Sequence, residues 1–279
     1  MSIVEQMLAR YPTGSREDQV HALREVMQEI ALAGLYRGGF FDKAAFYGGT
    51  CLRVFHGLSR FSEDLDFSLL QPDAEFKLER YFNAVRDEFA AFGFEVELAE
   101  KKKTAESAVV SAFLKKSTSI YDLQIRGQKT IKIKFEVDTD PPLGFDTQEN
   151  LLINPYSFYV KCFSIHDLFA GKMHALLFRR WKNRVKGRDW FDLEWYVRSG
   201  HPLGLSHFVE RARQSGDLAT CHFEPSDLLE LLEDRIRELD VSSAKRDVVG
   251  FIREPKQLDI WSREYFLQLS KMIRFHQLS

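Results

Sequence analysis

Two acidic residues stand inside an apolar run at the end of the stretch FYGGTCLRVFHGLSRFSEDLDFSLL, which covers residues 46–70. Asp64 and Asp66 alternate with large apolar side chains, so the segment predicts a strand over 65–69 with both carboxylates on one face. A carboxylate in apolar surroundings is costly unless it is paired, binds a cation or shifts its pKa. We therefore expect the rest of the chain to supply a partner for the pair.

The neighbouring segments predict a mixture of helices and strands. Ser15 and Asp18 predict a capping box for an amphipathic helix over 16–37. A second helix that contains Phe76 and Phe92 is expected to stop at Gly93. Further strands are expected at 44–47, 94–98, 108–114 and 130–138. In the last of these, Lys132, Lys134, Glu136 and Asp138 share the polar face.

The second half of the chain reads as mainly helical. A turn-rich segment at 139–154 is expected to link two lobes, and Ser164 with Asp167 suggests another capping box. Helices are expected at 164–183, 188–199, 204–213, 225–239 and 262–276. The whole predicts an α+β fold: an N-terminal lobe (1–150) with a mixed sheet and flanking helices, followed by a helical C-terminal lobe (151–279).

Composition narrows the classes of function. The chain has 279 residues and a formal net charge of −2, so any nucleic-acid surface has to be a local patch. Cys51, Cys162 and Cys221 are odd in number and widely spaced, which indicates reduced core thiols and argues against a zinc site. No signal peptide and no apolar run of about 18 residues is evident, so we expect a cytoplasmic protein without a membrane segment.

The residues around the acidic pair suggest phosphate chemistry. Gly48 and Gly49 enter a short helix, whose exposed N–H groups suit a phosphate, and Thr50 adds a hydroxyl. Asp64 and Asp66 are the kind of oxygen ligands that Mg²⁺ shares with substrate phosphates. Glu136 is a candidate third ligand, with Asp138 as its rival. A glycine pair or a DxD pair alone usually marks only a turn or a solvated surface, and it is their combination that favours phosphoryl or nucleotidyl transfer.

The stretch GGTCLRVFHGLSRFSEDLDF resembles the signature of the AbiEii/MenT-like nucleotidyltransferase toxins, which belong to the DNA polymerase β-like superfamily. It departs from the wider superfamily pattern by having GGT in place of GS and a longer spacer before DxD. The second half of the family pattern corresponds to GKMHALLFRR, with Lys172 and Arg179, and to GRDWFDLEW, with Asp189 and Asp192. The intervening WKNRVK makes the spacer between these blocks longer than expected, and the resemblance spans about 44–193.

The resemblance implies a role for each matched residue. Gly48, Gly49 and Thr50 would hold a triphosphate, Asp64 and Asp66 would hold Mg²⁺, and Ser62 would line the same site. Lys172 would contact the triphosphate, and Asp192 would either orient Lys172 or touch the nucleotide. Arg53 and Arg60 are either phosphate contacts or arginines that tie the glycine turn to the acidic strand. Arg179 is counted among the nucleotide-binding residues.

A basic run, RRWKNRVKGR, lies between the two matched blocks at 179–188. The six basic residues around Trp181 could bind the phosphates of a nucleic-acid backbone, although a solvated loop can have the same composition. Its position favours binding. Lys101–Lys103 and the strand lysines Lys132 and Lys134 are the alternative basic surface.

The sequence thus predicts a Mg²⁺-dependent nucleotidyltransferase that carries NMP from an NTP to an acceptor. The resemblance implies an RNA acceptor, with the 3′ end of tRNA first among the candidates, and a cognate antitoxin as partner in a toxin–antitoxin or abortive-infection system. The alternatives are a protein-directed NMP transferase or phosphotransferase, and a non-catalytic nucleotide-binding protein.

Overall fold

The computed structural model describes residues 1–12, 14–100, 118–125, 131–179, 185–219 and 222–276. The chain divides into two units. The sheet unit comprises Met1–Phe55, Glu63–Pro141 and Thr147–Cys162, and the helical unit comprises His56–Ser62, Pro142–Asp146 and Phe163–Ser279. The strand expected at 108–114 lies outside the described residues.

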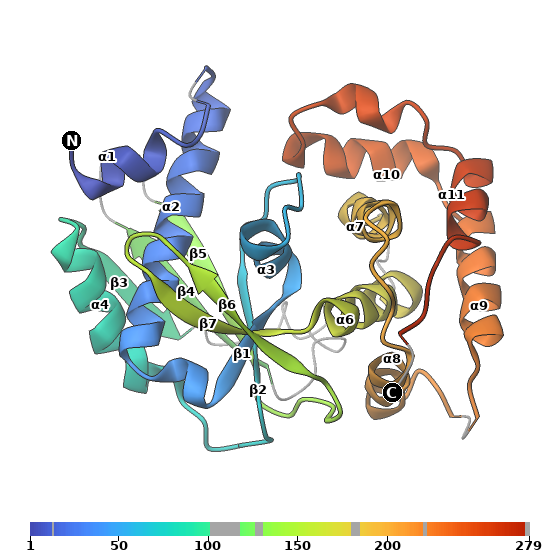
Figure 1. Ribbon diagram of the computed structural model, residues 1–279, viewed down its shortest axis with the longest axis horizontal. Coiled ribbons are helices and arrows are strands. Elements are labelled where there is room, and N and C mark those ends of the chain that lie inside the picture. Colours follow the sequence, from blue (N-terminus) through green and yellow to red (C-terminus); the bar gives the residue numbers. More distant parts are fainter. Residues whose placement is uncertain (13, 101–117, 126–130, 180–184, 220–221, 277–279) are drawn as a thin grey trace. The chain divides into compact units, whose positions relative to one another are not determined.

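Seven strands of the described residues form one sheet in the order β3-β4-β5-β2-β1-β7-β6 (Figure 1). Strand β1 pairs antiparallel with β2, whereas β2 with β5 and β1 with β7 are parallel pairs. The expected mixed sheet with flanking helices, and hence the α+β fold, is confirmed. The strands are β1 (Ala44–Tyr47), β2 (Leu65–Leu69), β3 (Val96–Glu100), β4 (Thr118–Ile125), β5 (Ile131–Asp138), β6 (Thr147–Leu152) and β7 (Phe158–Phe163).

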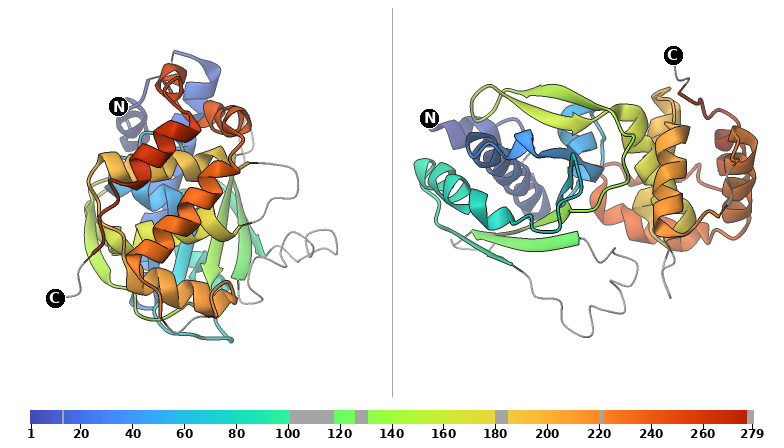
Figure 2. Two further views of the ribbon diagram at one scale, coloured as in Figure 1. Left: turned by 90° about the vertical axis from the view of Figure 1, so that its right-hand side faces the viewer. Right: turned by 90° about the horizontal axis from the view of Figure 1, so that it is seen from below.

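Helix α2 (Arg16–Arg37) lies against β5 and alongside α4 (Phe82–Ala91), as Figures 1 and 2 show. Its predicted capping box is confirmed: Ser15 Oγ accepts from Asp18 N–H at 3.0 Å, and Asp18 Oδ2 accepts from Ser15 N–H at 3.2 Å. The expected amphipathic pattern is wrong for the second half, where residues 25–35 are buried on all sides. The buried carboxylates of Glu25 and Glu29 are tolerated there because Arg53 pairs with Glu25 and Arg10 pairs with Glu29.

The remaining short helices of the sheet unit flank the strands. They are α1 (Ile3–Leu8), α3 (Gly48–Phe55) and the 3₁₀ turns Phe40–Asp42 and Leu78–Tyr81. The expected second helix is therefore α4 preceded by a 3₁₀ turn, and Gly93 follows it with a φ of +80°. Cys51 and Cys162 are buried free thiols, as expected, whereas Cys221 lies outside the described residues.

The turn-rich link expected at 139–154 is wrong in its second half, because Thr147–Leu152 forms the edge strand β6. Strand β7, which follows it, was also missed. Most side chains of β6 are polar and exposed or half-buried, which hides the strand from a hydrophobic pattern. Glu149 on β6 pairs with Lys161 on β7 at 3.5 Å, a cross-strand ion pair that fits the two strands' adjacency.

The helical unit contains α6 (Ile165–Phe178), α7 (Gly187–Arg198), α8 (Leu205–Ser215), α9 (Pro225–Arg237), α10 (Val241–Val248) and α11 (Arg263–Ser270). Helix α6 packs on α7 and α8, and α7 packs on α10 and α11 (Figure 2). Helix α10 was not expected from the sequence. The capping box expected at Ser164 is absent, because the Ser164 hydroxyl donates to the Asp167 carboxylate at 2.9 Å instead of accepting from the helix.

No helix among the described residues is long and apolar enough to cross a membrane.

Candidate active site

The acidic face of the sheet is built by two neighbouring parallel strands, β2 and β5. Their register sets Asp66 directly beside Glu136 and Ser68 beside Asp138, while Phe67 and Phe135 belong to the opposite, buried face. Side chains alternate along both strands, so the carboxylates of Asp66 and Glu136 share one face. Asp64, two residues before Asp66, stands at the start of the same row. The register thus sets the carboxylates of Asp66 and Glu136 side by side, and their role as metal ligands stays a prediction.

Gly48 meets this acidic face from the end of β1. The pairing of β1 with β2 sets Tyr47 opposite Asp66, so the next residue passes directly by the Asp66 carboxylate. A Cβ at position 48 would lie 2.9 Å from Asp66 Cβ and Cγ, and closer still to Oδ2. Gly48 also has a φ of +81°, in the left-handed region. Both the space and the backbone conformation therefore require glycine here.

Thr50 has a different environment from the one expected of a phosphate ligand. Its side chain is fully buried in α3, next to the buried Gly49, and its hydroxyl donates to the backbone carbonyl of Asp64. This hydrogen bond ties the start of α3 to the start of the acidic strand. Thr50 positions the two parts of the motif, and any contact of its hydroxyl with phosphate stays a prediction.

Lys134, on β5 of the sheet unit, is a cation that accompanies the acidic face. Lys134 Nζ makes an ion pair with Glu136 and interacts electrostatically with Asp64 and Asp66. Burial alone would lower the pKa of Lys134, but these carboxylates outweigh it and raise the pKa above its ordinary value. Asp138, the rival third ligand, is buried and its Oδ1 accepts from Asp140 N–H at 3.2 Å. The geometry favours Glu136.

The helical unit holds the second predicted group, Lys172 and Asp192. Arg60 donates from Nε to Asp192 Oδ1 at 2.6 Å and from Nη2 to Oδ2 at 2.7 Å, and Lys172 Nζ lies 2.8 Å from Oδ2. Asp192 is fully buried, which would raise its pKa, but Arg60 and Lys172 hold it below its usual value. Both carboxylate oxygens are occupied within the protein. Of the two predicted roles for Asp192, the geometry favours orienting Lys172.

Other predicted residues lie in less informative places. Arg53, largely buried, bonds Glu25 on α2 through Nε at 2.8 Å. Arg179 is exposed and follows the last residue of α6, and Ser62 is half-buried in the helical unit. Arg53, Ser62 and Arg179 as nucleotide contacts stay predictions. Residues 180–184 of the basic run, like Lys101–Lys103, lie outside the described residues.

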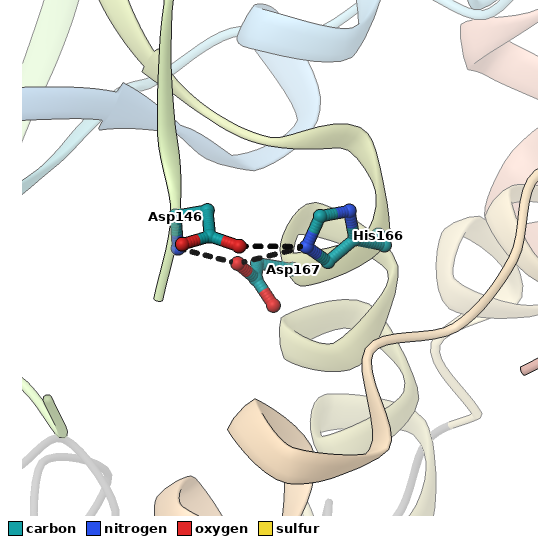
Figure 3. A group of neighbouring side chains, drawn as sticks. All are labelled: Asp146, His166 and Asp167. Atoms are coloured by element: carbon teal, nitrogen blue, oxygen red, sulfur yellow. Dashed lines mark hydrogen bonds and ion pairs between the residues drawn. The ribbon is translucent and has the colours of Figure 1, made fainter. Parts of the chain in front are cut away.

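Sequence reasoning missed a cluster at the start of α6, drawn in Figure 3. His166 Nε2 lies 3.4 Å from Asp146 Oδ2 and 3.5 Å from Asp167 Oδ2. Asp146 N–H donates to Asp167 Oδ2 at 2.7 Å, so the buried Asp167 ties the segment before β6 to the helix. The three side chains are close enough to share a cation. The signal available in the sequence was the His-Asp pair at the helix start, which reads equally well as helix capping.

The ion pair between Arg60 and Asp192 was also missed, because the two residues lie far apart along the chain. The sequence predicts Arg60 to be a phosphate contact or a link to the acidic strand, whereas the structure pairs it with Asp192, 132 positions later. No local spacing rule connects positions that far apart. Lys134 was visible as one of the alternating cations of β5, but its ion pair with Glu136 depends on the sheet face they share.

Comparison with known proteins places these features in a family. A family model described as "Nucleotidyl transferase AbiEii toxin, Type IV TA system" matches residues 30–278. No curated protein matches the chain. The fold is similar to JHP933 from Helicobacter pylori, at 20% identity and a TM-score of 0.54, over 90% of this chain and 89% of that one.

A second H. pylori structure, of a protein proposed to be a nucleotidyltransferase, gives 20% identity and a TM-score of 0.52, over 92% of this chain and 95% of that one. At this identity the likeness of the two structures concerns the fold. The family match covers most of the chain, including the glycine turn, the acidic strands and both helices that carry Lys172 and Asp192. The chain therefore belongs to the AbiEii family of nucleotidyltransferase toxins, and it is a nucleotidyltransferase.

Proposed function

We propose that this enzyme transfers NMP from an NTP to an RNA acceptor, with the 3′ end of tRNA as the first candidate, and that the reaction depends on Mg²⁺. The observation that carries the metal part of the proposal is the acidic face: Asp66 beside Glu136, Asp64 in the same row, and Gly48 leaving open the space at the Asp66 carboxylate. The RNA acceptor rests on the family resemblance and on the basic run at 179–188.

The residues of the acidic face fit a hard divalent cation. Carboxylate oxygens are the ligands that Mg²⁺ prefers, together with substrate phosphates and water. Asp64, Asp66 and Glu136 would hold the ion, which when bound neutralises charge that develops on the transferred phosphoryl group. Thr50 keeps the acidic strand in place through the Asp64 carbonyl. The backbone of Gly48 and Gly49, at the positive end of α3, is suited to phosphate oxygens.

In the helical unit, we assign the ammonium of Lys172 to the triphosphate by the family resemblance. Its contact with Asp192 supports this role, because a buried carboxylate held by two cations fixes the direction of the lysine side chain. The family description names a toxin–antitoxin system, so the proposed protein partner is a cognate antitoxin. Membership of a nucleotidyltransferase family sets aside the non-catalytic alternative.

The test is transfer of label from each of the four α-labelled NTPs, with total RNA and Mg²⁺ present. Label is expected in the tRNA fraction. Asp66→Asn or Asp64→Asn is expected to lower the rate at least about a hundredfold, because a lost metal ligand removes several kcal/mol of transition-state stabilisation. Asp87→Asn, an exposed carboxylate on α4 of the same unit, is the matched control and should act as wild type.

Two outcomes would redirect the proposal. Label found on protein while RNA stays unlabelled would favour the protein-directed NMP transferase. A wild-type rate in Asp64→Asn/Asp66→Asn would show that these carboxylates do not hold the catalytic metal. Folding of each variant is checked by circular dichroism, so that a lost rate is not confused with a lost fold.

A further inference from the structure

The acidic face already contains a cation of the protein's own. Lys134 stands one alternation before Glu136 on β5, directly before Phe135, whose register partner Leu65 follows Asp64. Its ammonium group is paired with Glu136 and interacts with both Asp64 and Asp66. Lys134 therefore lies among the three carboxylates to which the proposed function assigns the metal.

We propose that Lys134 is a built-in counter-cation of the metal-binding carboxylates, which compensates their charge in the metal-free enzyme and is displaced from Glu136 when a divalent cation binds. The inference rests on the proposed function, because it concerns the same three carboxylates. It adds a regulatory consequence. Lys134 lowers the affinity of the enzyme for a free divalent ion.

The surroundings of Lys134 separate it from an ordinary surface lysine. Its side chain is 31% exposed and that of Glu136 is 18% exposed, whereas Lys132, on the same face of the same strand, is exposed. A half-buried charge keeps more of its Coulomb interaction than a solvated one. Lys134 is thus held in the acidic row by the carboxylates, while its neighbour Lys132 faces water.

A metal ion is expected to displace Lys134 from Glu136 because of the ligand chemistry of the three carboxylates. Three carboxylates without compensation repel one another, so the metal-free face needs a cation to stay assembled. A lysine ammonium meets that need without fixed geometry, since it is a point charge on a flexible four-carbon stem. Glu136 cannot give the same oxygen to the ammonium and to a metal ion, and the two cations also repel each other at short range. Metal binding and the Lys134–Glu136 ion pair are therefore competing states.

The experiment measures metal binding directly, without turnover. Mn²⁺, a paramagnetic substitute for Mg²⁺, is titrated into the full-length protein without nucleotide, and the free ion is followed by electron paramagnetic resonance. Lys134→Met is expected to bind Mn²⁺ about tenfold more tightly than wild type, because a competing unit charge is removed at short range. Lys132→Met, with the same change of net charge on the same strand, should bind as wild type does.

Two further variants separate the charge of Lys134 from its packing. Lys134→Arg keeps the charge and should stay close to wild type. Lys134→Gln replaces Lys134→Met if the latter is poorly folded. Thermal unfolding supplies a second readout, since removal of the counter-cation should lower the Tm of the metal-free protein and increase the rise in Tm on adding Mn²⁺.

The outcomes distinguish this inference from the function on which it rests. Equal or weaker Mn²⁺ binding by Lys134→Met, with binding still lost in Asp66→Asn, would overturn the role of Lys134 and leave the metal site standing. If Lys134→Met and Lys132→Met bound Mn²⁺ more tightly by the same factor, the effect would be one of net charge alone, and the proposed role of Lys134 would be overturned. Wild-type affinity in Asp66→Asn would overturn both the metal site and the inference.

Discussion

Replacing Asp192 by asparagine should destabilise the helical unit strongly. Asp192 is fully buried, and each of its oxygens lies 2.6–2.8 Å from a nitrogen of Arg60 or Lys172. Asparagine keeps the shape but removes the charge and turns one oxygen into a donor, which faces the donors of Arg60 or Lys172. Arg60, only 3% exposed, would then be a buried cation without its carboxylate.

The expected cost follows from burial rather than from distance. Removing one partner of a buried ion pair costs about 3–5 kcal/mol, because the remaining charge is left without compensation. An exposed pair of the same geometry is worth about 0–1 kcal/mol. The chain provides this comparison: Asp234 and Arg237 on α9 are also 2.6 Å apart, but their side chains are 62% and 63% exposed. Asp234→Asn is the matched control.

Urea unfolding followed by tryptophan fluorescence measures the difference in the relevant unit, since all four tryptophans lie within residues 181–261. Equal losses in Asp192→Asn and Asp234→Asn, both below about 1 kcal/mol, would refute the burial argument. Replacing the network with Arg60→Met, Lys172→Met and Asp192→Leu together should recover much of the lost stability, because an apolar group of similar volume removes the buried charges.

The same network gives a dependence on pH. The pKa of Asp192 is lower in the folded protein than the value of about 3.9 expected when unfolded. Its contribution is therefore present above about pH 4 and is lost as the pH falls through the lower, folded pKa. Below pH 4, wild type should lose stability faster than Asp192→Asn. Parallel curves for the two proteins would show that Asp192 is not ionised in the fold.

Three further predictions test other parts of the structure. Gly48→Ala should weaken Mn²⁺ binding and destabilise the fold, because the new Cβ would meet the Asp66 carboxylate. Gly57 has a φ of +76° and open space around it, so Gly57→Ala should cost only the backbone strain of about 1–2 kcal/mol. Circular dichroism and metal titration follow both variants. His174 has a pKa lowered to about 4 by burial, with Arg211 adding to the effect, so the helical unit should lose stability as pH falls from about 6.5 toward 4. His174→Gln should flatten that loss in urea midpoints taken at pH 7 and pH 5. Lys172→Ala should weaken NTP binding by calorimetry and Lys172→Arg should not fully restore it, since the two cations differ in shape and hydration; unchanged affinity would leave Lys172 only as the partner of Asp192.

The elements that were predicted well share a strong local signal. Strand β5 alternates apolar and charged residues over its whole length, and α2 begins at a capping box that its own sequence contains. Strand β6 fails this test because it lies at the sheet edge, where polar side chains meet water and no apolar alternation is required. The buried second half of α2 shows the opposite limit: Glu25 and Glu29 look like solvent-facing residues until Arg53 and Arg10 are found beside them.

The candidate site shows the same division between local and long-range information. Asp64, Asp66 and Gly48 were predicted because they lie within one short stretch and their residue types match a known chemistry. The contacts that set their roles are not local: Glu136 joins Asp66 through a parallel strand pair, and Lys134 joins the group only through that face. The sequence alone points to the carboxylates, whereas the position of Lys134 beside them follows only from the sheet.

The spacer between the glycine turn and the acidic pair contributes a segment to the helical unit. After α3, residues His56–Ser62 leave the sheet unit and belong to the helical unit, and the chain returns at Glu63 to begin β2. The excursion is held within the helical unit by Phe61 N–H, which donates to the Phe251 carbonyl at 2.7 Å, and it brings Arg60 to Asp192. Within the helical unit, this segment supplies Arg60, which compensates the buried Asp192 carboxylate beside Lys172.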